Sequence, residues 1–104
     1  MNKIKYQDIV KQKGVRPITC LTAYTKSIAK ILDGIVDIVL VGDSVGTTMY
    51  DMKNTQGVTL QMMKDHGKAV NQNIKKSLTI VDMPYNTYTS KKQALKNAKE
   101  LLNY

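Results

Sequence analysis

The stretch IVLVGDS, which runs from Ile38 to Ser44, decides the fold class of this 104-residue chain. It is an unbroken aliphatic run that ends in an aspartate followed by turn residues, and the stretch LTIVDMP, from Leu78 to Pro84, repeats the pattern. An apolar run without alternation is typical of a strand that is buried on both faces, as in a parallel sheet covered by helices. A helix-length stretch separates the two runs. The pattern therefore predicts an α/β protein with parallel strands.

The first half of the chain predicts a leading helix, a strand, a short helix and a second strand. The leading helix covers about residues 6–13, with Ile9 and Val10 on its inner face. The first strand covers residues 18–24 and the second covers residues 36–42. The short helix between them begins at Thr25 or Ser27 and ends at Gly34. Its expected inward residues are Ile28, Ile31 and Leu32.

The second half predicts a loop, a long helix, a third strand and a last helix. Residues 44–57 are too many and too polar for a tight turn, and a loop of this length is usually functional or mobile. Thr59 can cap the long helix, because apolar or small residues recur after it at spacings of three and four. Ser90 and Gln93 form a capping-box pattern at the start of the last helix. The expected inward residues of these two helices are Leu60, Met63, Gly67, Val70 and Ile74, and then Ala94, Leu95, Ala98, Leu101 and Leu102.

This order of elements favours parallel strands joined by right-handed crossovers. The sequence has no internal repeat and no linker, so residues 1–104 are expected to form one domain or part of one. Three parallel strands leave both edges of the sheet open, and open edges are a liability unless something covers them. The sequence therefore predicts a piece of a larger sheet or barrel.

The composition limits the classes of protein and of site. The net charge is +8, but the fifteen lysines and single arginine are spread over helix faces, and no cluster of base-stacking aromatic residues accompanies them. A solvated surface is thus favoured over nucleic-acid binding. No apolar run approaches the roughly 20 residues of a membrane span, and the start of the chain lacks a secretory signal, so a cytoplasmic location is expected. Cys20, the only cysteine, excludes an internal disulfide or a cysteine-rich zinc site, and we expect a buried, inert thiol.

Asp43 and Asp82 are the candidate metal-binding residues, because each follows a predicted parallel strand. In such sheets the ligand site lies outside the carboxyl ends of the strands. Neighbouring strands are about 4.8 Å apart, so the two carboxylates can converge on one cation. Two carboxylates, with waters and a chelating substrate, are a normal arrangement for Mg²⁺, whereas the absence of paired His or Cys ligands argues against zinc. Ser44 can bind a substrate carboxylate through its hydroxyl or backbone N–H.

A purely structural interpretation of the same residues stays open at this point. Asp43 can cap the next turn, and Asp82 can begin an Asx-type turn before Pro84. His66 can act as an acid or base near neutral pH, but its place on a predicted helix, away from the strand ends, favours a surface or packing role. Tyr85 and Tyr88 either wall a ligand pocket or pack under a loop.

Five collinear segments carry a resemblance to a known family. They are Ile18–Tyr24, Val36–Gly46, Val58–Leu60, His66 with Lys68–Val70, and Val81–Tyr85. Together they resemble the amino-terminal part of the ketopantoate hydroxymethyltransferase family (3-methyl-2-oxobutanoate hydroxymethyltransferase). The match runs from about Arg16 to the end of the chain, and the pair of Gly-Asp-Ser-x-Gly and Asp-Met-Pro at this separation is quite specific to that family.

The resemblance implies a (βα)8 TIM-type barrel, of which residues 1–104 hold the leading helix and the first three βα units, as a partial and apparently truncated domain. It also implies transfer of a one-carbon unit from 5,10-methylenetetrahydrofolate to 3-methyl-2-oxobutanoate, which forms 2-dehydropantoate in pantothenate biosynthesis. Carried over, Asp43 and Asp82 bind Mg²⁺ and, together with Ser44, the α-keto acid. The family forms homo-oligomers.

The chain also departs from the family pattern. The third metal carboxylate and a substrate-binding lysine belong to a Lys-x-Glu-Gly-Gly motif on the fourth strand, the catalytic glutamate follows later, and none of these is in this sequence. We therefore expect the isolated chain to be inactive. The family usually has an acid after Ala-Tyr, where this chain has Thr25 and Lys26.

Two alternative functions remain. One is another Mg²⁺-dependent α-keto-acid barrel enzyme of the phosphoenolpyruvate mutase and isocitrate lyase group. The other is a non-catalytic basic module that binds an anionic partner or a parent subunit.

Overall fold

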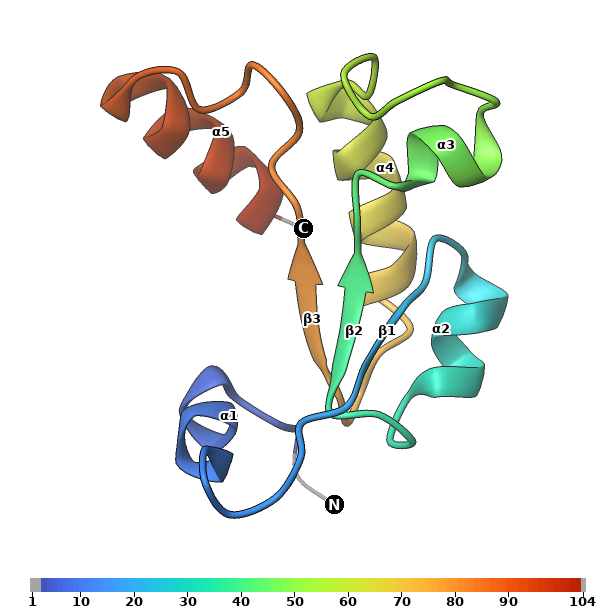
Figure 1. Ribbon diagram of the computed structural model, residues 1–104, viewed down its shortest axis with the longest axis vertical. Helices are drawn as coiled ribbons and strands as arrows, with labels where there is room; N and C mark the ends of the chain where they lie inside the picture. Colours follow the sequence, from blue (N-terminus) through green and yellow to red (C-terminus); the bar gives the residue numbers. More distant parts are fainter. Residues whose placement is uncertain (1–2, 104) are drawn as a thin grey trace.

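The computed structural model describes residues 3–103, which form three parallel strands and five helices (Figure 1). The strands are β1 (Cys20–Thr22), β2 (Ile38–Val41) and β3 (Leu78–Val81). The helices are α1 (Tyr6–Gln12), α2 (Lys26–Leu32), α3 (Val45–Met49), α4 (Leu60–Asn71) and α5 (Lys91–Leu102). The mixed α/β class with a parallel sheet is confirmed.

The sheet has the order β1-β2-β3, so the two aliphatic runs that predicted the fold lie side by side. Val39 pairs with Leu21 on one side and with Thr79 on the other, and both pairings are parallel. All three strands therefore end at one edge of the sheet, the upper edge in Figure 1. We call this the carboxyl edge and the opposite one the amino edge.

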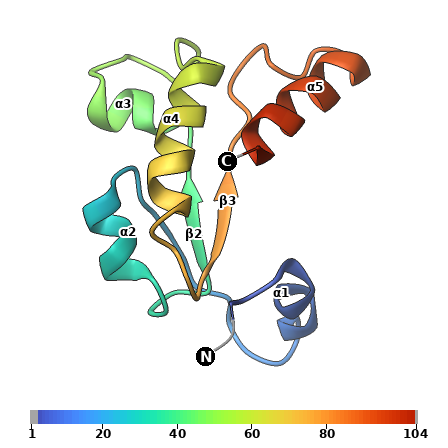
Figure 2. The same ribbon diagram turned by 180° about the vertical axis from the view of Figure 1, so that it is seen from behind.

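The core lies between the sheet and helix α4, which covers one face of the sheet (Figure 2). Val39 and Val41 of β2 are fully buried there, as are Met63 and Val70 of α4. The Thr59 side chain accepts a hydrogen bond from the Met62 N–H at 3.1 Å and so begins the helix where the sequence predicts. The predicted inward stripe of α4 is confirmed at Met63, Gly67 and Val70.

The other face of the sheet carries no helix among residues 3–103. All three residues of β1 are exposed, and Cys20 is an exposed free thiol. The expectation of a buried cysteine is therefore wrong. β1 is an outer strand of the sheet, with a neighbouring strand on one side only. An apolar run in a sequence does not show which part of the protein covers it.

The inward faces of the shorter helices and of α5 are also partly mispredicted. Helix α1 buries none of its residues, Val10 included. In α2 the buried residue is Ala29, while Ile28 and Ile31 are exposed. In α5 Leu101 is buried, but Leu95 and Leu102 are exposed, because this helix splays away from the sheet and packs mainly on α4 (Figure 1).

The predicted loop of residues 44–57 begins with a helix instead. Val45 to Met49 form α3, whose residue Val45 is fully buried. A Cβ on Gly46 would lie 2.6 Å from Val58 Cγ2 and 2.9 Å from Met52 Sδ, so this turn packs closely against the chain before α4. The prediction of a continuous loop is wrong for this part, because the buried contacts of Val45 and Gly46 stabilise a helical turn.

None of the helices between residues 3 and 103 is both long and apolar enough to cross a membrane.

Candidate functional site

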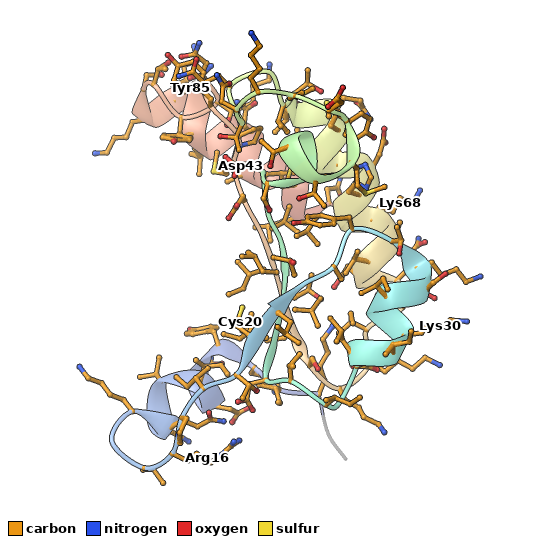
Figure 3. The ribbon with its side chains drawn as sticks, turned by 45° about the vertical axis from the view of Figure 1, so that its right-hand side comes forward. Arg16, Cys20, Lys30, Asp43, Lys68 and Tyr85 are labelled. Atoms are coloured by element: carbon orange, nitrogen blue, oxygen red, sulfur yellow. The ribbon has the colours of Figure 1, made fainter. Side chains whose placement is uncertain are left out.

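The two candidate aspartates meet at the carboxyl edge. Asp43 follows β2 and Asp82 follows β3, and Asp82 Oδ2 accepts a hydrogen bond from the backbone N–H of Asp43 at 2.9 Å. The prediction that neighbouring parallel strands bring these residues to one end of the sheet is confirmed. Figure 3 shows Asp43 at the top of β2, next to α3.

Most carboxylate oxygens of this pair lack a donor. Within residues 3–103, Asp43 accepts no hydrogen bond through its side chain, and Asp82 accepts only the one from the Asp43 N–H. The capping interpretation does not hold for Asp43, because the turn into α3 has no side-chain cap. Asp82 ties its loop to the neighbouring one instead of forming an Asx turn before Pro84. Both residues are half-buried, so part of each remains accessible to solvent.

Ser44 is joined to a residue that the sequence analysis did not select. Its Oγ lies 2.6 Å from the phenol oxygen of Tyr24, which follows β1. Tyr24 thus brings the end of the first strand to the site formed by the second and third strands. The strand-end rule that selected Asp43 and Asp82 also covers Tyr24, but an aromatic residue in an apolar segment was assigned to the strand itself.

The phenol of Tyr24 lies in a cluster of hydroxyl groups beside a carboxylate. Burial and the negative charge of Asp43 raise its pKa, whereas hydrogen bonds with Ser44, Thr22 and Thr48 lower it. The hydrogen bonds outweigh the opposing effects, so the pKa of Tyr24 is below its ordinary value. The Tyr24 hydroxyl is therefore a good hydrogen-bond donor.

His66 of α4 forms a hydrogen bond with the backbone of Tyr24. Its Nδ1 lies 2.7 Å from the Tyr24 carbonyl oxygen, and its Nε2 lies 2.8 Å from the hydroxyl of Tyr50, at the end of α3. A carbonyl only accepts, so Nδ1 carries the proton, and in the neutral ring Nε2 accepts from Tyr50. The packing role predicted for His66 is confirmed, but its expected distance from the strand ends is wrong, because it contacts the residue that follows β1.

Tyr85 and Tyr88 follow Asp82 and point outward. They are 49% and 57% exposed, so the interpretation as aromatic packing under a loop is wrong. Figure 3 places Tyr85 at the same end of the molecule as Asp43. Their role as pocket walls stays a prediction.

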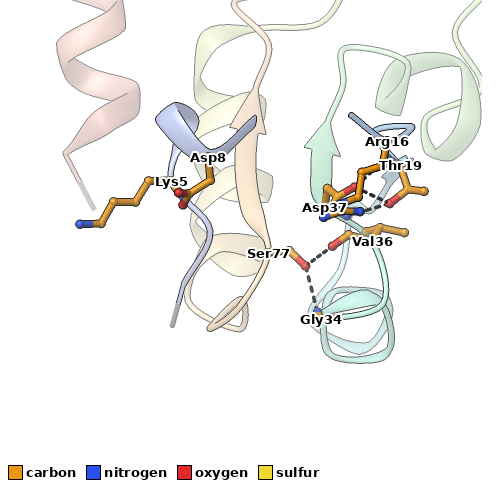
Figure 4. Close-up of polar contacts among 8 residues, drawn as sticks. All are labelled: Lys5, Asp8, Arg16, Thr19, Gly34, Val36, Asp37 and Ser77. Atoms are coloured by element: carbon orange, nitrogen blue, oxygen red, sulfur yellow. Dashed lines mark hydrogen bonds and ion pairs between the residues drawn. The ribbon is translucent and has the colours of Figure 1, made fainter. Parts of the chain in front are cut away.

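The amino edge holds two other aspartates, Asp37 and Asp33, whose surroundings are different. Figure 4 shows Asp37 with its partners. The side chain of Asp37, 5% exposed, accepts hydrogen bonds from the Thr19 N–H at 2.9 Å, the Thr19 hydroxyl at 3.1 Å and the Arg16 guanidinium at 3.1 Å. The Thr19 backbone N–H is the main cause of a lowered Asp37 pKa, and the Thr19 hydroxyl and Arg16 add to it against the effect of burial. These contacts hold β1 to the start of β2.

Asp33 in a similar way holds the segment that leads into β3. Its carboxylate accepts the backbone N–H groups of Lys75, Lys76 and Ser77 at 2.8–3.0 Å. Burial opposes ionisation, but these three donors outweigh it and lower the pKa of Asp33. The sequence analysis gave no role to either residue of the amino edge.

A separate cavity of about 280 Å³ lies between β3, α4 and α5. Its lining is mainly apolar and includes Val81, Met83 and Leu101, with Thr79 and Asn71 as polar members. Neither Asp43, Ser44 nor Asp82 lines it. It lies on the helix side of the sheet and is not the site described above.

Comparison with known proteins places the chain in a family. The family described as ketopantoate hydroxymethyltransferase matches residues 3–104. A 3-methyl-2-oxobutanoate hydroxymethyltransferase from Pelagibacter ubique (strain HTCC1062) is 50% identical over 103 residues, which is 99% of this chain and 40% of the relative. Enzymes of the same name from Chelativorans sp. (strain BNC1) and Anaplasma marginale (strain St. Maries) are each 51% identical over 96 residues. These matches cover 91% and 92% of this chain.

The chain spans little more than a third of the length of these relatives, from 34% to 40%. The chain belongs to the ketopantoate hydroxymethyltransferase family.

Proposed function

We propose that this chain provides the Mg²⁺-binding and α-keto-acid-binding part of a 3-methyl-2-oxobutanoate hydroxymethyltransferase. The observation that carries the proposal is the meeting of Asp43 and Asp82 at the carboxyl edge with most of their oxygens free of donors. The name of the relatives at about 50% identity supports the reaction. Family membership favours this function over that of the phosphoenolpyruvate mutase and isocitrate lyase group.

The residues present fit a hard divalent cation. Asp43 and Asp82 offer carboxylate oxygens, which Mg²⁺ prefers, and leave room for waters and substrate as further ligands. No third His, Cys, Asp or Glu joins them within residues 3–103, in keeping with a site completed from outside the chain. When bound, Mg²⁺ supplies Lewis acidity that stabilises negative charge developing next to the keto group.

The chain's own residues bind and orient the α-keto acid. The Ser44 hydroxyl, beside Asp43, is placed to donate to the substrate carboxylate, while Asp43 and Asp82 hold the metal-binding end. The one-carbon donor in this proposal is 5,10-methylenetetrahydrofolate. A folate pocket would include Tyr85 and Tyr88, which are both exposed. Figure 3 places Tyr85 at this end of the molecule.

Removal of the carbon-bound proton requires a general base, and we assign that role to none of residues 3–103. A general base must come within about 3 Å of the proton it removes, directly or through one water. Glu100, the only glutamate in the sequence, lies on α5, and its Oε2 is 3.7 Å from Lys64 Nζ. We therefore expect binding without turnover in the isolated chain.

The proposal includes the architecture. Three parallel strands with helices on one face, exposed β1 residues and a bare opposite face support residues 1–104 as part of a (βα)8 barrel domain. The homo-oligomer and the cytoplasmic location stay predictions.

The test measures metal and substrate binding by the 104-residue chain. Mn²⁺, which shares the oxygen preference of Mg²⁺, is titrated with detection by electron paramagnetic resonance. 3-Methyl-2-oxobutanoate is then titrated at saturating Mn²⁺ by calorimetry. Asp43→Asn and Asp82→Asn are each expected to weaken Mn²⁺ binding by at least about tenfold, because each removes a charged ligand.

Asp65→Asn is the matched control, because Asp65 is an exposed residue of α4 that bonds only to Gln61 within the described residues. Its affinity for Mn²⁺ should equal that of the wild-type chain. Equal affinities in all four proteins, or no binding by the wild-type chain, would contradict the proposed function.

A further inference from the structure

Tyr24 connects three elements at the carboxyl edge. It follows β1, its phenol contacts Ser44 between β2 and α3, and its carbonyl oxygen accepts from His66 of α4. Within residues 3–103, the side chain of Asp82 makes one hydrogen bond and that of Asp43 makes none. Tyr24 is therefore fixed from two sides, at its backbone and at its hydroxyl.

The contact with Ser44 determines where the serine hydroxyl can point. A free serine hydroxyl rotates about its C–O bond and has one proton to donate and two lone pairs. Either hydroxyl can be the donor in this 2.6 Å contact. A phenol is a stronger acid than an alcohol, which favours donation by the neutral Tyr24 to Ser44. One lone pair of Ser44 Oγ is then occupied, and its own proton is directed elsewhere.

The backbone beside Ser44 limits the remaining directions. Ser44 Oγ lies 3.0 Å from the point where a Cβ on Gly42 would stand, and Asp82 Oδ2 lies 3.4 Å from the same point. The hydroxyl is thus held against the end of β2, on the side where the Asp82 carboxylate approaches. Donation by Tyr24 also polarises the Ser44 O–H and strengthens the bond that Ser44 can donate.

We infer that Tyr24 is a positioning residue, which acts through Ser44 by directing the serine hydroxyl proton toward the carboxylate of the bound α-keto acid. This inference rests on the proposed function and adds Tyr24 to the residues of the keto-acid site. The sequence predicted only that Tyr24 belongs to the first strand. His66 supports the arrangement from behind, because its Nδ1–H bond to the Tyr24 carbonyl holds the backbone from which the phenol extends.

A double-mutant cycle separates positioning from a general structural role. Tyr24→Phe keeps the ring and removes only the hydroxyl, and Ser44→Ala removes its partner. Each substitution is expected to weaken binding of 3-methyl-2-oxobutanoate at saturating Mn²⁺ by about tenfold, the effect of losing one hydrogen bond to a charged group. The double variant should bind no more weakly than either single variant, because both changes remove the same interaction.

Mn²⁺ affinity without keto acid is the readout that a merely structural defect would move. It should be unchanged in all three variants, because neither hydroxyl is a proposed metal ligand. Tyr6→Phe, at a residue that is 66% exposed on α1, is the control and should bind keto acid as the wild-type chain does.

The outcomes distinguish this inference from the proposed function. Keto-acid affinity unchanged in Tyr24→Phe, or losses that add in the double variant, would overturn the positioning role and leave the proposed function standing. A loss of Mn²⁺ affinity in Tyr24→Phe would also overturn it, since Tyr24 would then support the whole edge. Absence of keto-acid binding by the wild-type chain would overturn the proposed function and the positioning role with it.

Discussion

The amino and carboxyl edges of the sheet each hold two aspartates, but the two pairs are surrounded differently. At the amino edge, Asp33 and Asp37 each accept three hydrogen bonds from described groups, and their pKa values are lowered. At the carboxyl edge, Asp43 accepts none through its side chain within residues 3–103, and Asp82 accepts one. A carboxylate whose oxygens are already bonded stabilises the fold, whereas one with free oxygens is available to a ligand.

The largest effect on stability is therefore expected at the amino edge. Asp37→Ala should lower the free energy of unfolding by about 2–3 kcal/mol, because it removes the buried carboxylate that accepts from the Thr19 N–H, the Thr19 hydroxyl and the Arg16 guanidinium. Asp82→Ala removes one backbone hydrogen bond and should cost about 1 kcal/mol or less. Urea unfolding followed by circular dichroism measures both.

A larger loss of unfolding free energy in Asp82→Ala than in Asp37→Ala would contradict this difference between the two edges. The metal affinities should show the opposite order, because Asp37→Ala keeps the Mn²⁺ site and Asp82→Ala loses a ligand. Equal losses of Mn²⁺ affinity in the two variants would mean that the edges do not differ in function.

A smaller effect is expected from pH. Both amino-edge aspartates have a lower pKa in the folded chain than in the unfolded chain, where an aspartate has a pKa of about 3.9. Their contribution to stability is complete above that unfolded value and is lost as the pH falls through the lower folded values. The free energy of unfolding should thus decrease below about pH 4.

Asp37→Asn sharpens this measurement, because an asparagine cannot titrate. The variant should be less stable at pH 7, and its stability should fall less steeply below pH 4 than that of the wild-type chain. Parallel curves for the two proteins would show that Asp37 is not a source of the acid sensitivity.

The smallest expected effect concerns the support of the carboxyl edge by His66. His66→Ala removes the donor to the Tyr24 carbonyl and the contact with Tyr50, and should cost about 1 kcal/mol. His66→Asn keeps a donor near the position of Nδ1 and should recover part of the loss. Equal destabilisation by both substitutions would indicate that the bond to Tyr24 contributes little.

The sequence predicts the carboxyl edge better than the amino edge for a physical reason. The runs before Asp43 and Asp82 specify buried parallel strands, and parallel strands must end together, so their terminal residues meet. At the amino edge, Asp33 bonds to residues 75–77 and Asp37 bonds to Thr19. These contacts depend on how the connecting segments pack together, which no periodic pattern in the sequence predicts. Tyr24 was missed as a site residue because it was assigned to the first strand, which ends two residues earlier, at Thr22.

The inward faces of α1, α2 and α5 show a second limit. Periodic spacing marks the apolar side of a helix, but burial requires another element on that side. Ile31 of α2 and Leu102 of α5 are apolar and exposed, while Met63 of α4 is buried because α4 lies across the sheet. Of these helices, α4 is the one that packs across the sheet, and its predicted inward residues Met63, Gly67 and Val70 are buried.

The central claim is that the carboxyl edge binds the metal and the amino edge does not, and paramagnetic broadening tests it most directly. Substoichiometric Mn²⁺ is added to the ¹⁵N-labelled chain, and the loss of each amide signal is recorded by nuclear magnetic resonance. We expect the strongest broadening at Asp43, Ser44 and Asp82, and little at Thr19 or Ser77 of the amino edge. Strongest broadening around Asp33 and Asp37, or uniform broadening over the chain, would contradict the assignment of the site.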